Sequence, residues 1–240
     1  MTAVAAMVTS GGVLADVGTD HGYIPIALVE EKKVQRAIAM DINEGPLSRA
    51  RENIVQNHLE KYVETRRSDG VEALTVGEAD SVLIAGMGGE LVIHILSAGE
   101  AVCRKAKELI LQPQSDIRKV REYLRLHQYK IVDEDMVCED GKYYPMMRVI
   151  PTACDDAWER MNKDIVTACD IYGPLLLKNG HPVLRRFLVL QHEQLNRILS
   201  TLKAQIQSEA IRTRIEQVKE EIACNESAYT ILGEIKNAGI

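Results

Sequence analysis

Short apolar runs alternate with amphipathic segments over roughly the first 150 residues of the chain. Each run is long enough for one buried strand, and the segments between them repeat apolar residues at helical spacing. Such alternation is typical of βαβ units, so we expect an α/β fold with a doubly wound, mostly parallel sheet. The predicted strands are Val13–Val17, Ala37–Met40, Val63–Arg67, Ser81–Ala85 and Leu109–Leu111, followed by an antiparallel pair, Lys130–Glu134 and Tyr143–Ile150, with a turn at Asp140-Gly141.

The pattern changes after Pro151, where the glycine-rich turns stop and long helical repeats begin. Apolar residues recur every three or four positions over residues 182–207 and again over 209–225, with a junction near Gln207 and Ser208. Two such helices should pair antiparallel as a hairpin. We therefore expect an α/β domain over residues 1–151 and a helical, coiled-coil-like domain over residues 152–240.

The loop from Asp16 to Tyr23 is the most informative segment for chemistry. Gly18 and Gly22 allow the backbone to turn sharply and to approach a ligand without a Cβ in the way. The next strand ends at Asp41, with Ile42 beside it, and a carboxylate there can accept hydrogen bonds from both ribose hydroxyls of an adenosine. Together these features predict an adenosine-containing cofactor and leave its identity open.

The glycine pattern distinguishes between two such cofactors. A dinucleotide pyrophosphate needs G-x-G-x-x-G with free backbone amides at the helix start. The chain has D-x-G-x-D-x-G instead, which places Asp16 and Asp20 where a pyrophosphate would lie and would repel it. S-adenosylmethionine carries a sulfonium and an α-amino group, which acids attract. The loop, with His21 inside it, therefore favours a methyl donor over a dinucleotide.

Polar and glycine-rich segments follow all five parallel strands. Because the carboxyl ends of parallel strands meet at one edge of a sheet, we expect these segments to form one cofactor and reaction site. Asp69 and Gly70 are candidates for the cofactor adenine, although Asp69 could instead be a helix cap. Ser115 and Asp116 are expected to cap the helix after the fifth strand. The remaining segments are Ala85–Gly89 and Gln112–Gln114.

The composition of the chain narrows the classes of protein to which it could belong. No apolar segment is long enough to span a bilayer, and the first residues lack the basic start of a secretion signal, so we expect a cytoplasmic protein. The five cysteines are scattered and form no ligand pair, so no metal site is expected. A net charge of −6 argues mildly against nucleic acid, although an acidic protein can still carry a local basic face.

Five motifs follow one another along the chain: Asp16–Pro25, Asn43–Pro46, Ile84–Gly89, Leu109–Pro113 and Gly141–Tyr144, followed by Tyr172–Leu175. Together with the helical C-terminal part, they resemble the bacterial tRNA (adenine-N1)-methyltransferases that modify adenosine-22 in the D-arm. The resemblance extends over nearly the whole chain. It implies a Rossmann-like class I methyltransferase fold, S-adenosylmethionine as the donor, and a C-terminal domain that helps to hold tRNA.

Residue roles follow from the motifs and the resemblance together. Adenine N1 has a free lone pair at neutral pH, so positioning rather than proton removal should dominate the reaction. The alternative for the glycine segment is a turn that needs glycine only for its geometry. The catalytic candidates are Gly86, Met87, Gly88, Gly89 and Gln112; the cofactor candidates are Asp16, Gly18, Asp20, His21, Asp41, Ile42, Asp69, Gly70, Ala85 and Gly86; and the tRNA candidates are Tyr143, Arg185 and Arg186.

Other functions remain open at the level of sequence. One is an S-adenosylmethionine-dependent enzyme that methylates a small molecule or a protein, and another is an NAD-linked oxidoreductase, which Asp20 disfavours. A non-catalytic binding protein is the least favoured. The expected partner is tRNA, and neither a membrane nor a metal is expected. The expected oligomeric state is a monomer or a weak dimer.

Overall fold

The computed structural model describes residues 2–152, 162–205 and 208–234. The chain forms two compact units: Met1–Asp135 with Tyr144–Cys154, and Met136–Tyr143 with Asp155–Ile240. The predicted helix junction at Gln207 lies outside the described residues. So does Cys154, one of the five scattered cysteines.

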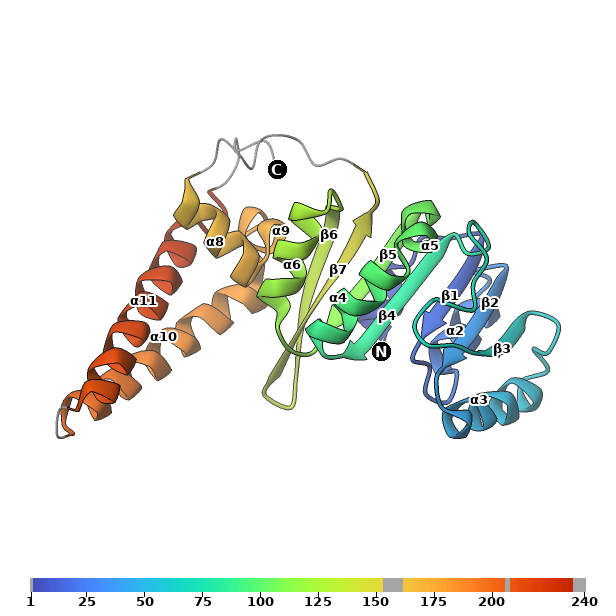
Figure 1. The fold of residues 1–240 in the computed structure, drawn as a ribbon, viewed down its shortest axis with the longest axis horizontal. Helices are drawn as coiled ribbons and strands as arrows, with labels where there is room; N and C mark the ends of the chain where they lie inside the picture. The colour runs from blue at the N-terminus through green and yellow to red at the C-terminus, as the bar shows by residue number, and fades with distance from the viewer. Residues whose placement is uncertain (1, 153–161, 206–207, 235–240) are drawn as a thin grey trace. The chain divides into compact units, whose positions relative to one another are not determined.

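One sheet organises the first unit (Figure 1). Its strands are β1 (Val13–Val17), β2 (Arg36–Asp41), β3 (Val63–Arg67), β4 (Ser81–Met87), β5 (Glu108–Pro113), β6 (Lys130–Glu139) and β7 (Lys142–Ile150). They lie in the order β3-β2-β1-β4-β5-β7-β6, with β1 to β5 parallel and β7 antiparallel to β5. The predicted doubly wound α/β fold is confirmed.

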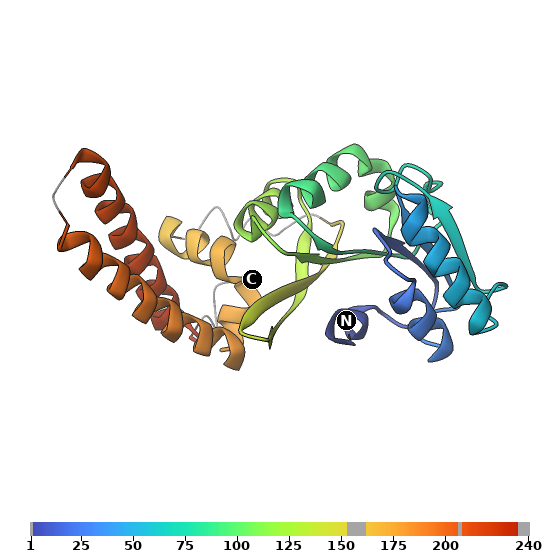
Figure 2. The same ribbon diagram turned by 90° about the horizontal axis from the view of Figure 1, so that it is seen from below.

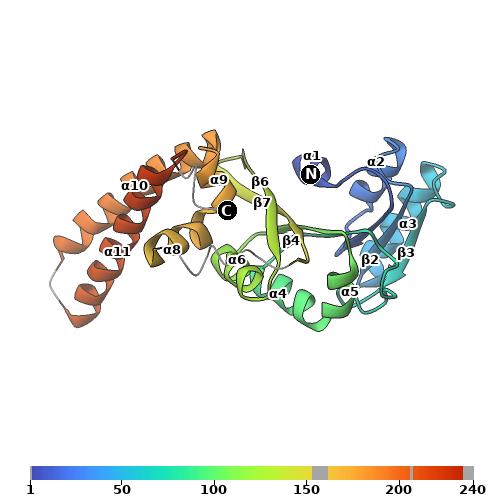
Figure 3. The same cartoon turned by 90° about the horizontal axis from the view of Figure 1, so that it is seen from above.

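Helices cover both faces of this sheet. They are α1 (Thr2–Met7), α2 (Tyr23–Glu30), α3 (Glu44–Gln56), α4 (Gly89–Ala98), α5 (Glu100–Lys105) and α6 (Ile117–Leu126). Figure 3 shows α2 and α3 on one face and α4 and α6 on the other. This two-sided cover explains the nearly continuous apolar runs of β1, β2 and β4, since a parallel strand in such a sheet is buried on both sides.

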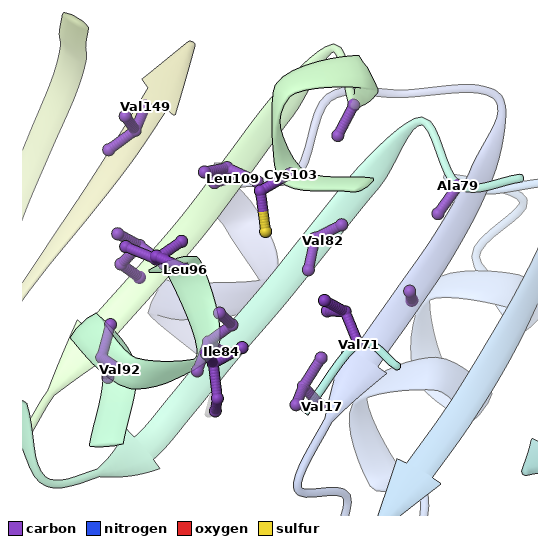
Figure 4. Close-up of a cluster of buried hydrophobic side chains, with 14 of the residues drawn as sticks. Val17, Val71, Ala79, Val82, Ile84, Val92, Leu96, Cys103, Leu109 and Val149 are labelled. Atoms are coloured by element: carbon purple, nitrogen blue, oxygen red, sulfur yellow. The ribbon is translucent and has the colours of Figure 1, made fainter. Parts of the chain in front are cut away.

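The hydrophobic core beneath α4 is buried from solvent (Figure 4). Val92 and Leu96 of this helix pack over Val82 and Ile84 of β4 and Leu109 of β5, and all five side chains are 0% exposed. Burial of each such side chain contributes about 1.5–3 kcal/mol. This packing fixes β4 and β5, the strands that lead into the catalytic candidates.

Three local predictions were wrong. β4 continues past Ala85 through Met87, and β5 extends to Pro113, because the two strands keep pairing across a register shift. Asp116 does occupy the position before α6, but its side chain makes no capping hydrogen bond. Its backbone is left-handed, at φ 50°, and its carboxylate pairs instead with Lys119 at 3.0 Å.

In the part that the structure describes, the regular elements of the second unit are helices, apart from the tip of the β6–β7 hairpin. It contains α8 (Lys163–Tyr172), α9 (Pro174–Lys178), α10 (Pro182–Lys203) and α11 (Glu209–Ile231), with α10 and α11 side by side (Figure 2). Buried Asn225 donates to the Leu188 carbonyl and to Gln191, which also accepts from the Tyr172 hydroxyl. This polar network can fix the register of the hairpin, since a shifted helix would leave its groups unpaired. Among the described helices, none has the length and apolarity to cross a membrane.

Candidate active site

The sheet order places a crevice at the carboxyl ends of β1 and β4. β1 is followed by a connection to β2 on one side, whereas β4 leads to β5 on the other, so the chain diverges between these two central strands. In doubly wound sheets a ligand binds at such a switch point. The candidate segments that follow β1 to β5 therefore meet at one edge, as predicted.

The loop after β1 is held against β2. The backbone N–H groups of Gly18 and Thr19 both donate to the Met40 carbonyl, at 2.8 and 2.7 Å. Gly18 has φ 75°, and a Cβ there would lie 2.1 Å from Cε of Met87. The Met87 side chain thus covers Gly18, which brings a cofactor candidate and a catalytic candidate into contact.

Asp16 is a buried carboxylate, 6% exposed, on β1 one residue before the strand ends. Burial raises the pKa of Asp16 to about 6; the neighbouring Thr19 hydroxyl acts in the opposite direction, and the nearby charge of Asp41 adds to the increase. A cation placed beside Asp16 would stabilise its ionised form. The site therefore fits a sulfonium or ammonium group and would repel a pyrophosphate.

Asp20 differs from Asp16 because it is exposed and already paired. Arg49 of α3 donates to its carboxylate at 2.8 Å, and this guanidinium holds the pKa of Asp20 below its usual range. Next in the loop, the ring of His21 stacks on Tyr23 with centroids 5.1 Å apart. The charge of Asp20 is thus partly neutralised within the protein, and Asp16 is the stronger candidate for the cation.

The ends of β2 and β3 form a shallow hollow of about 320 Å³. Asp41 ends β2 and accepts a hydrogen bond from the Asn43 N–H at 2.7 Å, and Ile42 beside it is 49% exposed. Asp69 lies in a turn that no helix follows directly, so its alternative role as a helix cap does not apply. The hollow is lined by Ile42, Arg67, Ser68, Asp69, Glu72 and Ala73.

A bulge shapes the end of β4. The β4–β5 register shifts between Ala85 and Met87, and the intervening Gly86 has φ 78°, a conformation that favours glycine. The Gly86 N–H donates to Oε1 of Gln112 at 3.0 Å. The bulge therefore joins two catalytic candidates across the ends of adjacent strands.

Comparisons with known proteins extend this picture. Residues 1–147 match the family described as "Methyltransferase domain". The tRNA (adenine(22)-N(1))-methyltransferase of Bacillus subtilis strain 168 is 34% identical over 226 residues, which cover 91% of this chain and 94% of the relative. The chain belongs to this methyltransferase family.

Two solved structures share the fold over both units. The crystal structure of the B. subtilis M1A22 tRNA methyltransferase TrmK superimposes with a TM-score of 0.82 at 30% identity, covering 95% of this chain and 96% of that one. A putative tRNA (m1A22) methyltransferase from Streptococcus pneumoniae, solved in complex with S-adenosyl-L-methionine, gives 0.80 at 28% identity, with coverage of 95% and 97%. Family membership supports the methyl donor over the dinucleotide.

The tRNA candidates of this methyltransferase lie in the second unit. Arg185 and Arg186 are exposed near the start of α10, and the Arg185 guanidinium lies 5.8 Å from the centre of the Tyr229 ring. Tyr143 packs edge-on against Phe187, with centroids 4.9 Å apart, as part of the apolar core of this unit. Its ring is thus already engaged, so a stacking role toward a base has less support than a packing role.

Some residues that lie at the candidate site gave no signal in the sequence. Arg49 meets Asp20 only through the packing of α3, and Glu72 and Ala73 reach the hollow through a turn without a motif. Ser115 was expected as a cap, but its carbonyl and its hydroxyl accept hydrogen bonds from the Gly89 N–H, at 3.1 and 3.3 Å. Within the described residues, no group of three His, Cys, Asp or Glu could hold a metal.

The contact at Gly89 leads to a prediction. A Cβ on Gly89 would lie 2.4 Å from the Ser115 backbone carbonyl oxygen, so Gly89→Ala must force the two loops apart. Overpacking of this kind costs about 1–3 kcal/mol. We expect a lower free energy of unfolding by that amount in urea titrations, and a loss of methyl transfer as the glycine segment moves.

Gly88→Ala is the matched control. Gly88 has φ −64°, and a Cβ there meets only the Ser115 hydroxyl at 3.3 Å, a side-chain atom that can rotate away. Stability should change by less than about 0.5 kcal/mol. Equal destabilisation by both variants would show that the close approach of Ser115 is not what requires glycine.

Proposed function

We propose that this methyltransferase transfers the methyl group of S-adenosylmethionine to N1 of adenosine-22 in the D-arm of tRNA. The observation that carries the proposal is the 34% identity with the B. subtilis enzyme over 91% of the chain, which includes both units. The crevice adds chemical support, because a buried acid lies beside a glycine turn at the switch point. We also propose a cytoplasmic location, where tRNA is found, and a monomer or a weak dimer.

Different parts of the cofactor would be bound by residues at the ends of successive strands. Ile42 and Asp69 line the hollow at the ends of β2 and β3 and, together with Gly70, would bind the adenine. Asp41 would bind the ribose hydroxyls. Asp16 and the loop of Gly18, Asp20 and His21 would face the methionine part, with Ala85 and Gly86 completing the wall at the end of β4. When bound, S-adenosylmethionine supplies an electrophilic methyl group on a positively charged sulfur.

The remaining chemistry is positioning. The N1 lone pair forms the new bond to the methyl carbon as the carbon–sulfur bond breaks, and the positive charge moves to the base without loss of a proton. No general base is needed, so the segment from Gly86 to Gly89 and Gln112 act by aligning the base. Alignment in a near-attack geometry can supply several kcal/mol of barrier reduction. The target base must leave its stack to expose N1, at a cost of a few kcal/mol.

The function is tested by incubating the protein with unmodified tRNA and labelled S-adenosylmethionine. We expect label in the tRNA and arrest of reverse transcriptase at position 22, because N1 methylation blocks Watson–Crick pairing. A tRNA carrying guanosine at position 22 is the control and should remain unlabelled. Label without arrest at position 22, or equal label in the control, would contradict the proposed acceptor.

The basic pair on α10 gives a prediction for tRNA binding. Replacing Arg185 and Arg186 by alanine should weaken tRNA affinity and reduce the slope of log affinity against log salt by about 2, since two phosphate contacts would be lost. Filter binding at several salt concentrations measures both. Affinity for the methyl donor should not change.

The control uses two cations of α11 that are already paired. Arg214 lies 2.8 Å from Glu221, and Lys219 lies 2.8 Å from Glu216. Replacing both by alanine removes the same formal charge but should leave the salt slope within about 0.5 of the wild-type value. Equal slopes in the two double variants would place the tRNA contacts elsewhere.

A further inference from the structure

The side chain of Gln112 has a defined orientation. It lies half-buried at the carboxyl end of β5, and its Oε1 accepts the Gly86 N–H at 3.0 Å. A backbone N–H can only donate, so the amide oxygen must face Gly86 and the amide NH₂ must point away. The Gly86 bulge is what aims this N–H at Gln112, because the β4–β5 register shifts there.

The hydrogen-bonding capacity of this amide is only partly used. Within the described chain, its NH₂ group donates to no protein acceptor. Its oxygen has a second lone pair, so it can accept one more hydrogen bond alongside that from Gly86. Gln112 thus presents an acceptor and a donor side by side, in an order that the Gly86 bond fixes.

The strand order indicates which part of the substrate lies next to the amide of Gln112. The proposed adenosine end of the cofactor lies over β3 and β2, and its methionine end lies between β1 and β4. β5 is the next strand beyond β4, so the acceptor base must approach over the ends of β4 and β5. That is the position of Gly86 and Gln112.

The chemistry of adenine selects one edge for recognition. N1 must point at the methyl group, so the Watson–Crick edge is committed to the reaction. The Hoogsteen edge stays free and presents the N6–H donor beside the N7 acceptor, which a glutamine side chain matches with two hydrogen bonds. We propose that Gln112 binds N6 and N7 of the target adenine and so selects it over guanine, whose O6 would oppose the amide oxygen.

This inference rests on the proposed function, and Gln112→Glu tests it. The variant keeps an oxygen for the Gly86 N–H and for N6 but replaces the donor to N7 with a negatively charged acceptor. We expect kcat/KM for tRNA to fall about 10- to 100-fold. The Kd for S-adenosylmethionine should stay within about twofold. Gln56→Glu, on the exposed end of α3, makes the same charge change and should leave both values unchanged.

A tRNA carrying 7-deazaadenosine at position 22 isolates the contact, because it lacks the N7 acceptor. The wild-type enzyme should lose about 10-fold in kcat/KM on this substrate, whereas Gln112→Glu should lose little more than it has already lost. Fully additive losses, or a fall in donor affinity that matches the fall in activity, would overturn the role of Gln112. Absence of wild-type methylation at position 22 would instead overturn the proposed function.

Discussion

Replacing Asp16 by asparagine should weaken S-adenosylmethionine binding by about 100-fold, because the amide cannot offer a negative charge to the cationic donor. The same change should make the empty protein more stable. The two effects have one cause, which is a carboxylate that is 6% exposed near the carboxyl end of β1. Burial of the ionised carboxylate is costly when no ligand is bound, whereas a cation beside the carboxylate stabilises its ionised form.

The direction of the stability effect follows from the pKa of Asp16, which burial raises from 3.8 to about 6. The folded protein therefore prefers the protonated acid. That contribution to stability is fully present below pH 3.8 and is lost as the pH rises through about 6. At pH 7.5 the ionised group costs about 3 kcal/mol, at 1.4 kcal/mol per pKa unit. Asparagine removes this cost.

Urea unfolding and calorimetry together test this prediction. The free energy of unfolding of Asp16→Asn should exceed that of the wild type by about 2–3 kcal/mol at pH 7.5, and by only about 1 kcal/mol at pH 4.5. Donor affinity of the wild type should fall as the pH drops below about 6, where Asp16 becomes protonated. Affinity of the variant should not follow that titration.

Asp140→Asn provides the control for Asp16→Asn. Asp140 lies in the exposed β6–β7 turn, so loss of its charge should change stability by less than about 0.5 kcal/mol. Donor binding should be unaffected. A variant at Asp16 that bound the donor within threefold of the wild type, or that was less stable at pH 7.5, would contradict the role given to this carboxylate.

The parallel sheet could be predicted because its signal is local. Val63–Arg67 coincides with β3, and the apolar runs of β1, β2 and β4 mark strands that helices cover on both faces. The predicted position of the site rests on the same pattern, since parallel strands bring their carboxyl ends to one edge. Asp16 and Asp41 became candidates in this way.

Features that depend on contacts between distant segments escaped prediction. The short helices α1 and α5 have too few residues for a clear repeat, and packing stabilises them. Glu108 begins β5 as a charged residue, yet it is buried because Thr9 and Ser81 donate to its carboxylate. Likewise, the bulge at Gly86 arises from the pairing of β4 with β5, and no glycine motif alone could place it beside Gln112.

Loss of the buried Arg121 guanidinium should strongly destabilise the first unit. Nε of this α6 residue lies 2.9 Å from Oε1 of Glu134 on β6, and the two side chains are 2% and 0% exposed. Arg121→Met would remove the guanidinium that is paired with this buried carboxylate, and breaking a buried ion pair typically costs about 3–5 kcal/mol. Urea titration should show this loss, and activity should fall as α6 and the Ser115 loop before it lose their support.

A double variant separates the charge from the packing. Arg121→Met combined with Glu134→Leu replaces the pair with apolar side chains of similar size, and such replacements are often neutral or stabilising. We expect its stability to return to within about 1 kcal/mol of the wild type. Arg118→Met, on the exposed side of the same helix, should cost less than about 0.5 kcal/mol. If the double variant were as unstable as the single one, loss of the Arg121–Glu134 charge pair would not explain the instability, and the two side chains would be needed for packing.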